Sequence, residues 1–363
     1  MKNNEKNEKK RIAVFLPSLS MDGISILFKN LSYLWDHSRF EIVYFLTDGQ
    51  NEGYWENDVI KNNIRVVHIK EITKRNYFLY GFIILRALTS HGKFDVVHVN
   101  LDFINGLVLF VAKLLRIPLR ISHIHSSYDM GKTWLIHDIH AFIMRKLTKF
   151  SANIFLAPSD LSGKYFYKKL NFRVINNGIF IDQFLSVKNQ RNLKEWKFIS
   201  VGSFIPLKNP LFLLDVFCEI LKIRSDSTMT WIGSGKLKNK VVDISKERKV
   251  FNNIRFLDQE NHVNEVLKRH DYFLFPSVSE GLGIALIEAQ AAGLDCFISD
   301  GIPKSADCGK CLQIELIRSP AEWAKTICDF ISSGRRLSID MDKLSQFDIH
   351  RTADELMNIY ESI

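Results

Sequence analysis

The 363-residue chain has few cysteines, and those that it has form no recognisable framework. There are five, an odd number, and Cys218 and Cys296 stand inside apolar runs, which is typical of a reducing compartment. Cys308 and Cys311 form a C-x-x-C pair. A zinc site needs a second pair or nearby histidines, and thioredoxin-like surroundings are missing too. We therefore expect this pair to be a coincidence within a loop.

Long apolar runs are also missing. The most apolar tracts, 77–88 and 103–115, are too short or too interrupted by polar residues to span a bilayer. Residues 1–10 are mostly Lys, Asn and Glu without an apolar centre, so they do not resemble a signal peptide and are expected to be a disordered tail. These features predict a cytoplasmic protein, for which peripheral contact with the inner face of the plasma membrane stays open.

Acidic residues are scarce in the first half relative to basic ones. Residues 1–186 hold 25 Lys and Arg against 16 Asp and Glu, whereas residues 187–363 hold 24 of each, so the first half carries the whole net charge of +9. A basic domain favours an anionic membrane or a nucleic acid as partner. No recognised nucleic-acid motif is present, so we expect the membrane and no nucleic acid. A solvated basic face is the alternative.

Short apolar strands alternate with segments of helical periodicity along the whole chain. This alternation predicts parallel sheets covered by helices on both faces, and the length suggests about two such domains. No G-x-G-x-x-G follows the first strand, so a dinucleotide cofactor has no support. Asn176-Asn177-Gly178 indicates a turn, and Ser159 and Ser319 are expected helix N-caps. The expected strands are 11–16, 41–46, 64–68, 94–99, 119–124, 154–158, 196–201, 228–232, 253–257, 272–275, 296–299 and 312–316.

The stretch 275–300, FPSVSEGLGIALIEAQAAGLDCFISD, combines a strand, a glycine-rich turn and a helix. This arrangement points backbone N–H groups at an anion, and Gly281 and Gly283 allow a ligand to approach the chain closely. Glu280 lies in the turn and Glu288 on the helix. The stretch therefore predicts an anion site with two carboxylates beside it.

The pattern Glu280-x7-Glu288 in this context resembles the donor-site motif of retaining glycosyltransferases of family 4, as found in capsular and exopolysaccharide biosynthesis. Their GT-B fold has two facing Rossmann-like domains. The resemblance implies that Glu280 lies beside the donor sugar and that Glu288 holds the nucleotide ribose. It also implies that a backbone run cradles the diphosphate, namely Gly281, Leu282, Gly283 and Ile284.

Other segments resemble the same family with departures. Lys208 matches a lysine that pairs with the donor diphosphate, and the turn at Gly233 resembles one beside the nucleotide. Ser203 occupies the position of the family's arginine, which removes one diphosphate partner. In the first loop, Asp22-Gly23 replaces two adjacent glycines, so Gly23 alone remains for a phosphate contact.

Two histidines near the end of the strand 119–124 compete for one role. The resemblance implies that His125, followed by serines, faces the reacting sugar, but His123 would point to the same side. His98 lies mid-strand and is expected to be structural. His137 and His140 form H-x-x-H on a helix without a third ligand nearby, so we expect a packing or surface role.

The resemblance implies a complete division of the chain: a tail (1–10), an acceptor-binding domain (11–187), a nucleotide-sugar-binding domain (188–345) and a helix (346–363) that crosses back to the first domain. We expect Glu280, His125 and Lys208 to carry retaining transfer of a sugar to a growing, lipid-linked glycan. No Asp-x-Asp motif stands in a suitable loop, so we expect no metal and no cofactor other than the nucleotide-sugar co-substrate.

Two alternatives stay open. Another GT-B enzyme, such as an epimerase or a synthase with a soluble acceptor, would show no membrane association. A non-catalytic partner subunit of a glycosyltransferase would fit the departures at Asp22 and Ser203, although both glutamates are retained.

Overall fold

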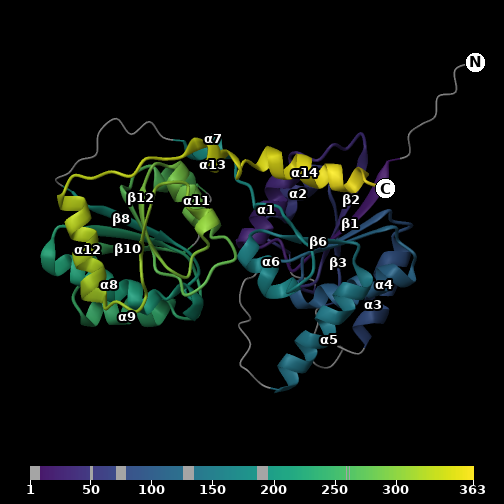
Figure 1. Cartoon of the computed structure of the whole chain (residues 1–363), viewed down its shortest axis with the longest axis horizontal. Coiled ribbons are helices and arrows are strands. Elements are labelled where there is room, and N and C mark those ends of the chain that lie inside the picture. Colours follow the sequence, from purple (N-terminus) through teal and green to yellow (C-terminus); the bar gives the residue numbers. More distant parts are fainter. Residues whose placement is uncertain are drawn as a thin grey trace, which may run out of the picture. The chain divides into compact units, whose positions relative to one another are not determined.

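The computed structural model describes residues 9–49, 52–70, 79–125, 135–185, 195–258, 260 and 262–363. The chain divides into two compact units (Figure 1): Met1–Gly178 with Ile349–Ile363, and Ile179–Asp348. The first unit gives way to the second after Gly178, earlier in the sequence than the expected domain boundary at residue 187. The polar linker expected at 186–194 lies outside the described residues. Most of the expected tail, residues 1–8, also lies outside them.

The first unit contains a seven-stranded parallel sheet of order β3-β2-β1-β4-β5-β6-β7. The strand order reverses between β1 and β4, which makes the loops after these two strands the place where ligands collect in such sheets. Its strands are β1 (Lys10–Leu16), β2 (Phe40–Leu46), β3 (Arg65–His68), β4 (Val96–Val99), β5 (Leu119–His123), β6 (Ile154–Ala157) and β7 (Arg173–Val174). Its helices are α1 (Gly23–Ser32), α2 (Glu56–Lys61), α3 (Tyr80–Ser90), α4 (Asn105–Leu114), α5 (Leu135–Ser151), α6 (Asp160–Tyr167) and α14 (Ile349–Glu361).

The second unit contains a six-stranded parallel sheet of order β10-β9-β8-β11-β12-β13, which reverses between β8 and β11. Its strands are β8 (Lys197–Val201), β9 (Thr228–Ile232), β10 (Ile254–Leu257), β11 (Tyr272–Phe275), β12 (Asp295–Ser299) and β13 (Cys311–Ile314). Its helices are α7 (Ile181–Phe184), α8 (Pro210–Ile223), α9 (Lys238–Glu247), α10 (Val263–Leu267), α11 (Ile284–Ala291), α12 (Pro320–Ser332) and α13 (Met341–Ser345). The predicted α/β fold with two Rossmann-like domains is confirmed.

The helix α14 belongs to the first unit, as expected for a terminal helix that crosses back. Its residue Tyr360 is fully buried and packs against Trp35 and Phe40, with ring centroids 5.8 and 6.0 Å away. The Tyr360 hydroxyl also forms a 2.7 Å hydrogen bond with Nδ1 of His98 on β4. The end of the chain is therefore part of the core of the first unit.

The turn predicted at 176–178 is wrong, because these residues form no turn in the structure. Gly178 instead allows a close approach. A Cβ atom there would lie 2.6 Å from Cα of Ile349 and 2.5 Å from Oγ1 of Thr352. The side-chain hydroxyl of Thr352 donates to the carbonyl of Asn176 at 2.9 Å. Glycine is needed here because α14 begins against this segment.

Several local predictions are confirmed. The Ser159 side chain accepts a hydrogen bond from Ser162 N at the start of α6, and Ser319 forms a capping box with Glu322 at the start of α12. The predicted strands are confirmed with bounds that differ by at most two residues, whereas the short strand β7 was not predicted. The C-x-x-C pair is not confined to a loop, because Cys311 begins β13 while Cys308 precedes it. All five cysteines are free thiols.

Candidate functional site

Two loops meet at the point where the strand order of the second sheet reverses. Residues 202–209 follow β8 and residues 276–283 follow β11. These strands are neighbours in the sheet although their starts, at residues 197 and 272, are 75 residues apart in the sequence. The backbone N–H of Val278 donates to the carbonyl of Leu207 at 2.8 Å, which ties one loop to the other. The predicted anion site is therefore held in place by both loops.

Lys208 and Glu280 form an ion pair across these loops. The Lys208 ammonium donates to both carboxylate oxygens of Glu280, at 2.5 and 2.6 Å. The two side chains are 25% and 8% exposed, and Lys208 Nζ also lies 5.4 Å from the centroid of the Phe275 ring. The structure thus brings two of the predicted site residues into direct contact, at a depth where removing either partner is costly.

A small cavity lies beside this pair and collects polar groups. It is lined by Ser203, Lys208 and Ser277, together with apolar residues that include Trp231 and Phe275. Ser277 is fully buried, and its hydroxyl has no hydrogen-bond partner among the described residues. Two hydroxyls and an ammonium group can together donate to an oxyanion.

The start of α11 presents backbone donors to the same region. Gly283, with φ of 88°, precedes the helix and provides no side-chain cap. A Cβ atom at this position would lie 3.2 Å from the Phe275 ring, so both conformation and space favour glycine. The side chain of Leu282 is buried in the core, so only its backbone is available to a ligand. The first N–H groups of α11, from Ile284 onward, are suited to an anion.

Glu288 lies on α11, about one turn after its start at Ile284. Burial raises the pKa of its carboxyl group to about 8. The residue keeps some exposed surface, although the carboxyl lies deep in the protein. At neutral pH this group therefore carries a proton, unlike a carboxylate in water.

The loop at Gly233 lies against the loop that carries Ser203. A Cβ atom on Gly233 would come within 2.0 Å of the Gly202 carbonyl oxygen, so a side chain has no room. The ammonium of Lys238 donates to the carbonyls of Gly233 and Leu257, at 3.0 and 3.1 Å. Lys238 therefore joins the ends of β9 and β10. Sequence analysis missed this role, because a lysine in a charged helix gives no signal for it.

In the first unit, His125 lies at the carboxyl edge of the sheet. Its Nε2 is 2.9 Å from Oδ1 of Asn100, and its backbone N–H donates to Asp102 at 2.9 Å. Burial lowers the pKa of His125 to about 4, against the opposing effect of Asp102 and Asp22. The Asn100 amide nitrogen donates to Phe15, so its oxygen accepts from Nε2–H of a neutral imidazole. The Nδ1 atom is then an acceptor.

The rings of His123 and His125 lie in contact, with centroids 4.2 Å apart, but their other surroundings differ. His123 is 1% exposed, and its Nδ1 lies 3.1 Å from Nε2 of His98, which bonds in turn to Tyr360. Burial lowers the pKa of His98 to about 3, so this chain of rings is neutral. His123 therefore belongs to the interior and His125 to the edge. The serines that follow His125, and the side chain of His137, lie outside the described residues.

Gly23 is the first residue of α1, which Asp22 caps. The backbone N–H groups of Ile24 and Ser25 both donate to Oδ1 of Asp22 at 3.0 Å. The departure from the family pattern at Asp22 thus has a structural consequence: the Asp22 carboxylate already accepts hydrogen bonds from two backbone amides at the start of α1.

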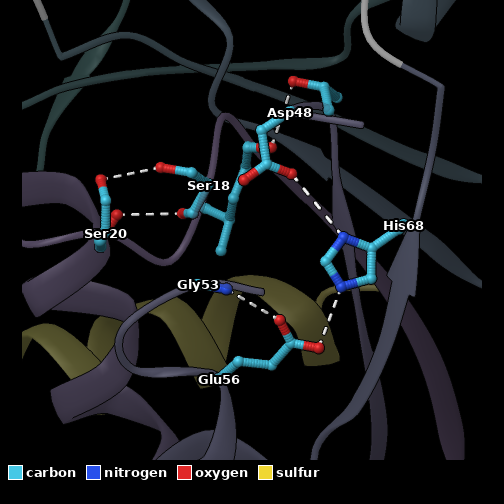
Figure 2. Close-up of polar contacts among 9 residues, drawn as sticks. Ser18, Ser20, Asp48, Gly53, Glu56 and His68 are labelled. Atoms are coloured by element: carbon cyan, nitrogen blue, oxygen red, sulfur yellow. Dashed lines mark hydrogen bonds and ion pairs between the residues drawn. The ribbon is translucent and has the colours of Figure 1, made fainter. Parts of the chain in front are cut away.

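A second polar cluster lies at the carboxyl edge of β1 to β3 (Figure 2). His68 Nε2 is 2.9 Å from Glu56, and its Nδ1 is 3.7 Å from Asp48. The hydroxyls of Ser18 and Ser20 lie 2.9 Å apart in the loop after β1. We call these five residues the polar edge. Sequence analysis missed them, although Ser18, Asp48 and His68 each stand where a strand ends.

Within the described parts of the chain, no three His, Cys, Asp or Glu side chains are grouped as a metal site would require. The same residues include no helix of the length and hydropathy that crossing a bilayer demands.

Comparison with known proteins adds to this geometry. The family model described as Glycosyltransferase Family 4 matches residues 21–183, and the one described as Glycosyl transferases group 1 matches residues 182–311. The capsular polysaccharide biosynthesis glycosyltransferase CapH of Staphylococcus aureus is 31% identical over 89% of this chain and 91% of its own. The putative glycosyltransferase EpsF of Bacillus subtilis is 25% identical over 98% of this chain and 97% of its own.

A third relative, of Escherichia coli, is named UDP-Gal:alpha-D-GlcNAc-diphosphoundecaprenol alpha-1,3-galactosyltransferase, and it is 24% identical over 61% of both chains. Among solved structures, Anabaena Alr3699/HepE in complex with UDP and glucose has a TM-score of 0.79 at 13% identity. That likeness covers 98% of this chain and 100% of the other. At this identity the likeness concerns the fold alone.

Proposed function

Because the chain is a glycosyltransferase that belongs to family 4, with the GT-B fold, we propose that it moves a sugar from a nucleotide diphosphate sugar to a growing capsular or exopolysaccharide glycan, with retention at the anomeric carbon. The observation that supports this most is the Lys208–Glu280 ion pair beside the start of α11. It combines a cation, a carboxylate and backbone donors at one place.

The second unit binds the donor in this proposal. The diphosphate lies against the first amides of α11, from Gly283 and Ile284, and draws the Lys208 ammonium from Glu280 toward itself. Positive charge and amide dipoles at this point stabilise the leaving nucleoside diphosphate as its bond to the sugar breaks. Glu280 faces the donor sugar, and Glu288 accepts hydrogen bonds from the ribose hydroxyls.

Ser203 and Ser277 complete the donor site. Their hydroxyls line the cavity that Lys208 also lines, and the Ser277 hydroxyl is buried without a partner among the described residues. We infer that these hydroxyls donate to phosphate oxygens where the family has an arginine. A hydroxyl supplies a weaker hydrogen bond than a guanidinium, so the affinity for the diphosphate is expected to be lower.

The first unit binds the acceptor in this proposal. His125 offers a neutral acceptor nitrogen to a hydroxyl of the reacting sugar, and the polar edge supplies carboxylates and hydroxyls of the kind that bind sugars. We propose a lipid-linked acceptor, because the Escherichia coli relative is named for a diphosphoundecaprenol substrate. The basic first half of the chain suits such an acceptor at an anionic membrane.

Calorimetric titration tests the donor site. UDP, GDP, ADP and their sugar derivatives are titrated into the protein in EDTA, beginning with UDP because of the complex named above. We expect one base to bind without a metal and Glu288→Ala to lose at least tenfold in affinity. Binding that the variant leaves unchanged would refute the assignment of Glu288. No binding by the unaltered protein would favour a non-catalytic partner subunit.

A further inference from the structure

The helix α5 has one face that packs and one that does not. Ala141, Met144, Thr148 and Ser151 are buried. They lie toward α4, where a Cβ atom on Gly106 would come within 2.5 Å of the Met144 carbonyl oxygen. Small residues and this glycine let the two helices approach closely. The inner face of α5 is therefore buried against α4.

The outer face of α5 is apolar but exposed. Ile139, Phe142, Ile143 and Phe150 recur at helical spacing, and each is between 50% and 61% exposed. Large side chains of this kind normally face the core of a helix's own domain. Four of them on one stripe mark an interaction site rather than scattered surface residues.

The neighbouring helices extend this surface. In the same unit, α3 packs beside α4 and α4 beside α5 (Figure 1). Leu79 and Phe82 at the start of α3, and Leu114 at the end of α4, are between 62% and 65% exposed. We call the outer residues of α5 together with these three the α3–α5 face.

The charge of these helices is mainly positive, and Asp138 of α5 is the one acidic residue in the sequences of α3, α4 and α5. The segments 79–94, 103–125 and 139–159 contain eight Lys and Arg residues and no Asp or Glu. Cations lie among the aromatic rings: Lys146 Nζ is 5.3 Å from the centroid of Phe142, and Lys113 Nζ is 3.4 Å from that of Phe150. Exposed aromatics interleaved with cations are the composition of helices that lie in a membrane interface.

We propose that the α3–α5 face docks the protein on an anionic lipid bilayer, with Phe142, Ile143 and Phe150 inserted among the acyl chains and Lys146 and Lys149 at the phosphates. An anionic lipid surface suits both the apolar stripe and the excess of positive charge on these helices. A second copy of the chain would instead place cations against cations, which is unfavourable. This face is thus the surface through which the first unit would contact the anionic membrane of the proposed function. Binding to the membrane does not depend on whether the protein transfers a sugar.

Sedimentation of the full chain with vesicles tests the proposal. Vesicles of phosphatidylcholine alone are compared with vesicles containing 30% phosphatidylglycerol, at low and high salt. We expect binding only to the anionic vesicles and its weakening by salt. The double variants Phe142→Gln/Ile143→Gln and Lys146→Glu/Lys149→Glu should each lower the partition coefficient about tenfold or more.

The control variant is Ile317→Gln/Lys240→Glu, which changes an exposed apolar residue and an exposed lysine of the second unit and should bind vesicles normally. Thermal unfolding and nucleotide titration verify that each variant is folded and keeps its donor site. Phe142→Trp should show a blue shift of its emission with anionic vesicles.

Three results would overturn the proposal. The first is that the unaltered protein does not bind anionic vesicles, and the second is that the α5 variants bind them as well as the unaltered protein does. The third is that the protein forms a dimer that the α5 substitutions dissociate, without binding vesicles. None of them bears on nucleotide binding, so failure here is distinguishable from failure of the donor site.

Discussion

The proton on Glu288 gives the donor site a specific pH dependence. Burial raises the pKa of this carboxyl to about 8, whereas a ribose with two hydroxyl donors is bound best by the ionised form. The free protein must then lose a proton when the nucleotide binds. Raising the pH from 7 to 9 increases the ionised fraction from roughly one in eleven to roughly ten in eleven, so the apparent affinity should rise about tenfold.

Calorimetry measures this linkage directly. Titrations at pH 7 in two buffers of different ionisation enthalpy give the number of protons released, which should be about one for each nucleotide bound. Glu288→Gln should abolish both this release and the rise in affinity, and it also serves as the control for titration of the phosphate itself. An affinity that is flat between pH 7 and 9 in the unaltered protein would refute the reasoning.

The same proton affects stability with a defined sign. The folded protein holds the Glu288 proton up to a pKa of about 8, whereas the unfolded chain loses it near its ordinary value of 4.5. The free energy of unfolding should therefore decrease as the pH rises through this window, and less so in Glu288→Gln. Chemical denaturation at pH 5 and 8 compares the two proteins.

Four further outcomes are expected. Lys208→Met leaves the buried Glu280 carboxylate unpaired, so it should lower the unfolding free energy by about 3 kcal/mol and also weaken nucleotide binding. The control is Lys310→Met, which breaks another buried ion pair of the same unit and should lower stability without changing nucleotide binding. Burial lowers the pKa of His98 to about 3, so below pH 6.5 the unfolded chain gains a proton that the folded chain does not. Denaturation should show that the free energy of unfolding falls by about 2 kcal/mol between pH 6.5 and 5, and by less in His98→Gln. Ser203→Arg should tighten nucleoside diphosphate binding about tenfold in calorimetry, and unchanged affinity would show that the hydroxyl is sufficient. Asp48→Asn should raise the KM for the acceptor and not for the donor, and equal changes in both would remove the polar edge from the acceptor site.

The sheets were predictable because each strand is a short apolar run bounded by polar residues. Periodicity also predicted that the sheets are parallel, since strands joined by helices of this length form parallel sheets, but it did not predict the strand order. The pairing of Lys208 with Glu280 was not predictable from periodicity, because 72 residues separate them and their contact depends on β8 lying beside β11. The motif indicated each residue, and the topology brought them together.

Contacts between distant segments explain what the sequence analysis missed. Gly178 was interpreted as a turn residue, but its absent side chain makes room for the start of α14, which no local pattern reveals. His98 and Tyr360 form a hydrogen bond across 262 residues. In the polar edge, nothing in the sequence distinguishes Asp48 and Glu56 from other acidic residues, and only the fold shows that both lie next to His68.

Cleavage of a nucleotide sugar tests the central claim most directly. The purified protein is incubated with the nucleotide sugar that calorimetry identifies, with anionic vesicles present and with water as the acceptor of the sugar, and the released nucleoside diphosphate is quantified by chromatography. We predict steady release by the unaltered protein and a loss of about a hundredfold or more in Glu280→Gln, since a group beside the reacting sugar acts on the transition state. Release at an unchanged rate by Glu280→Gln would contradict the assignment of this site.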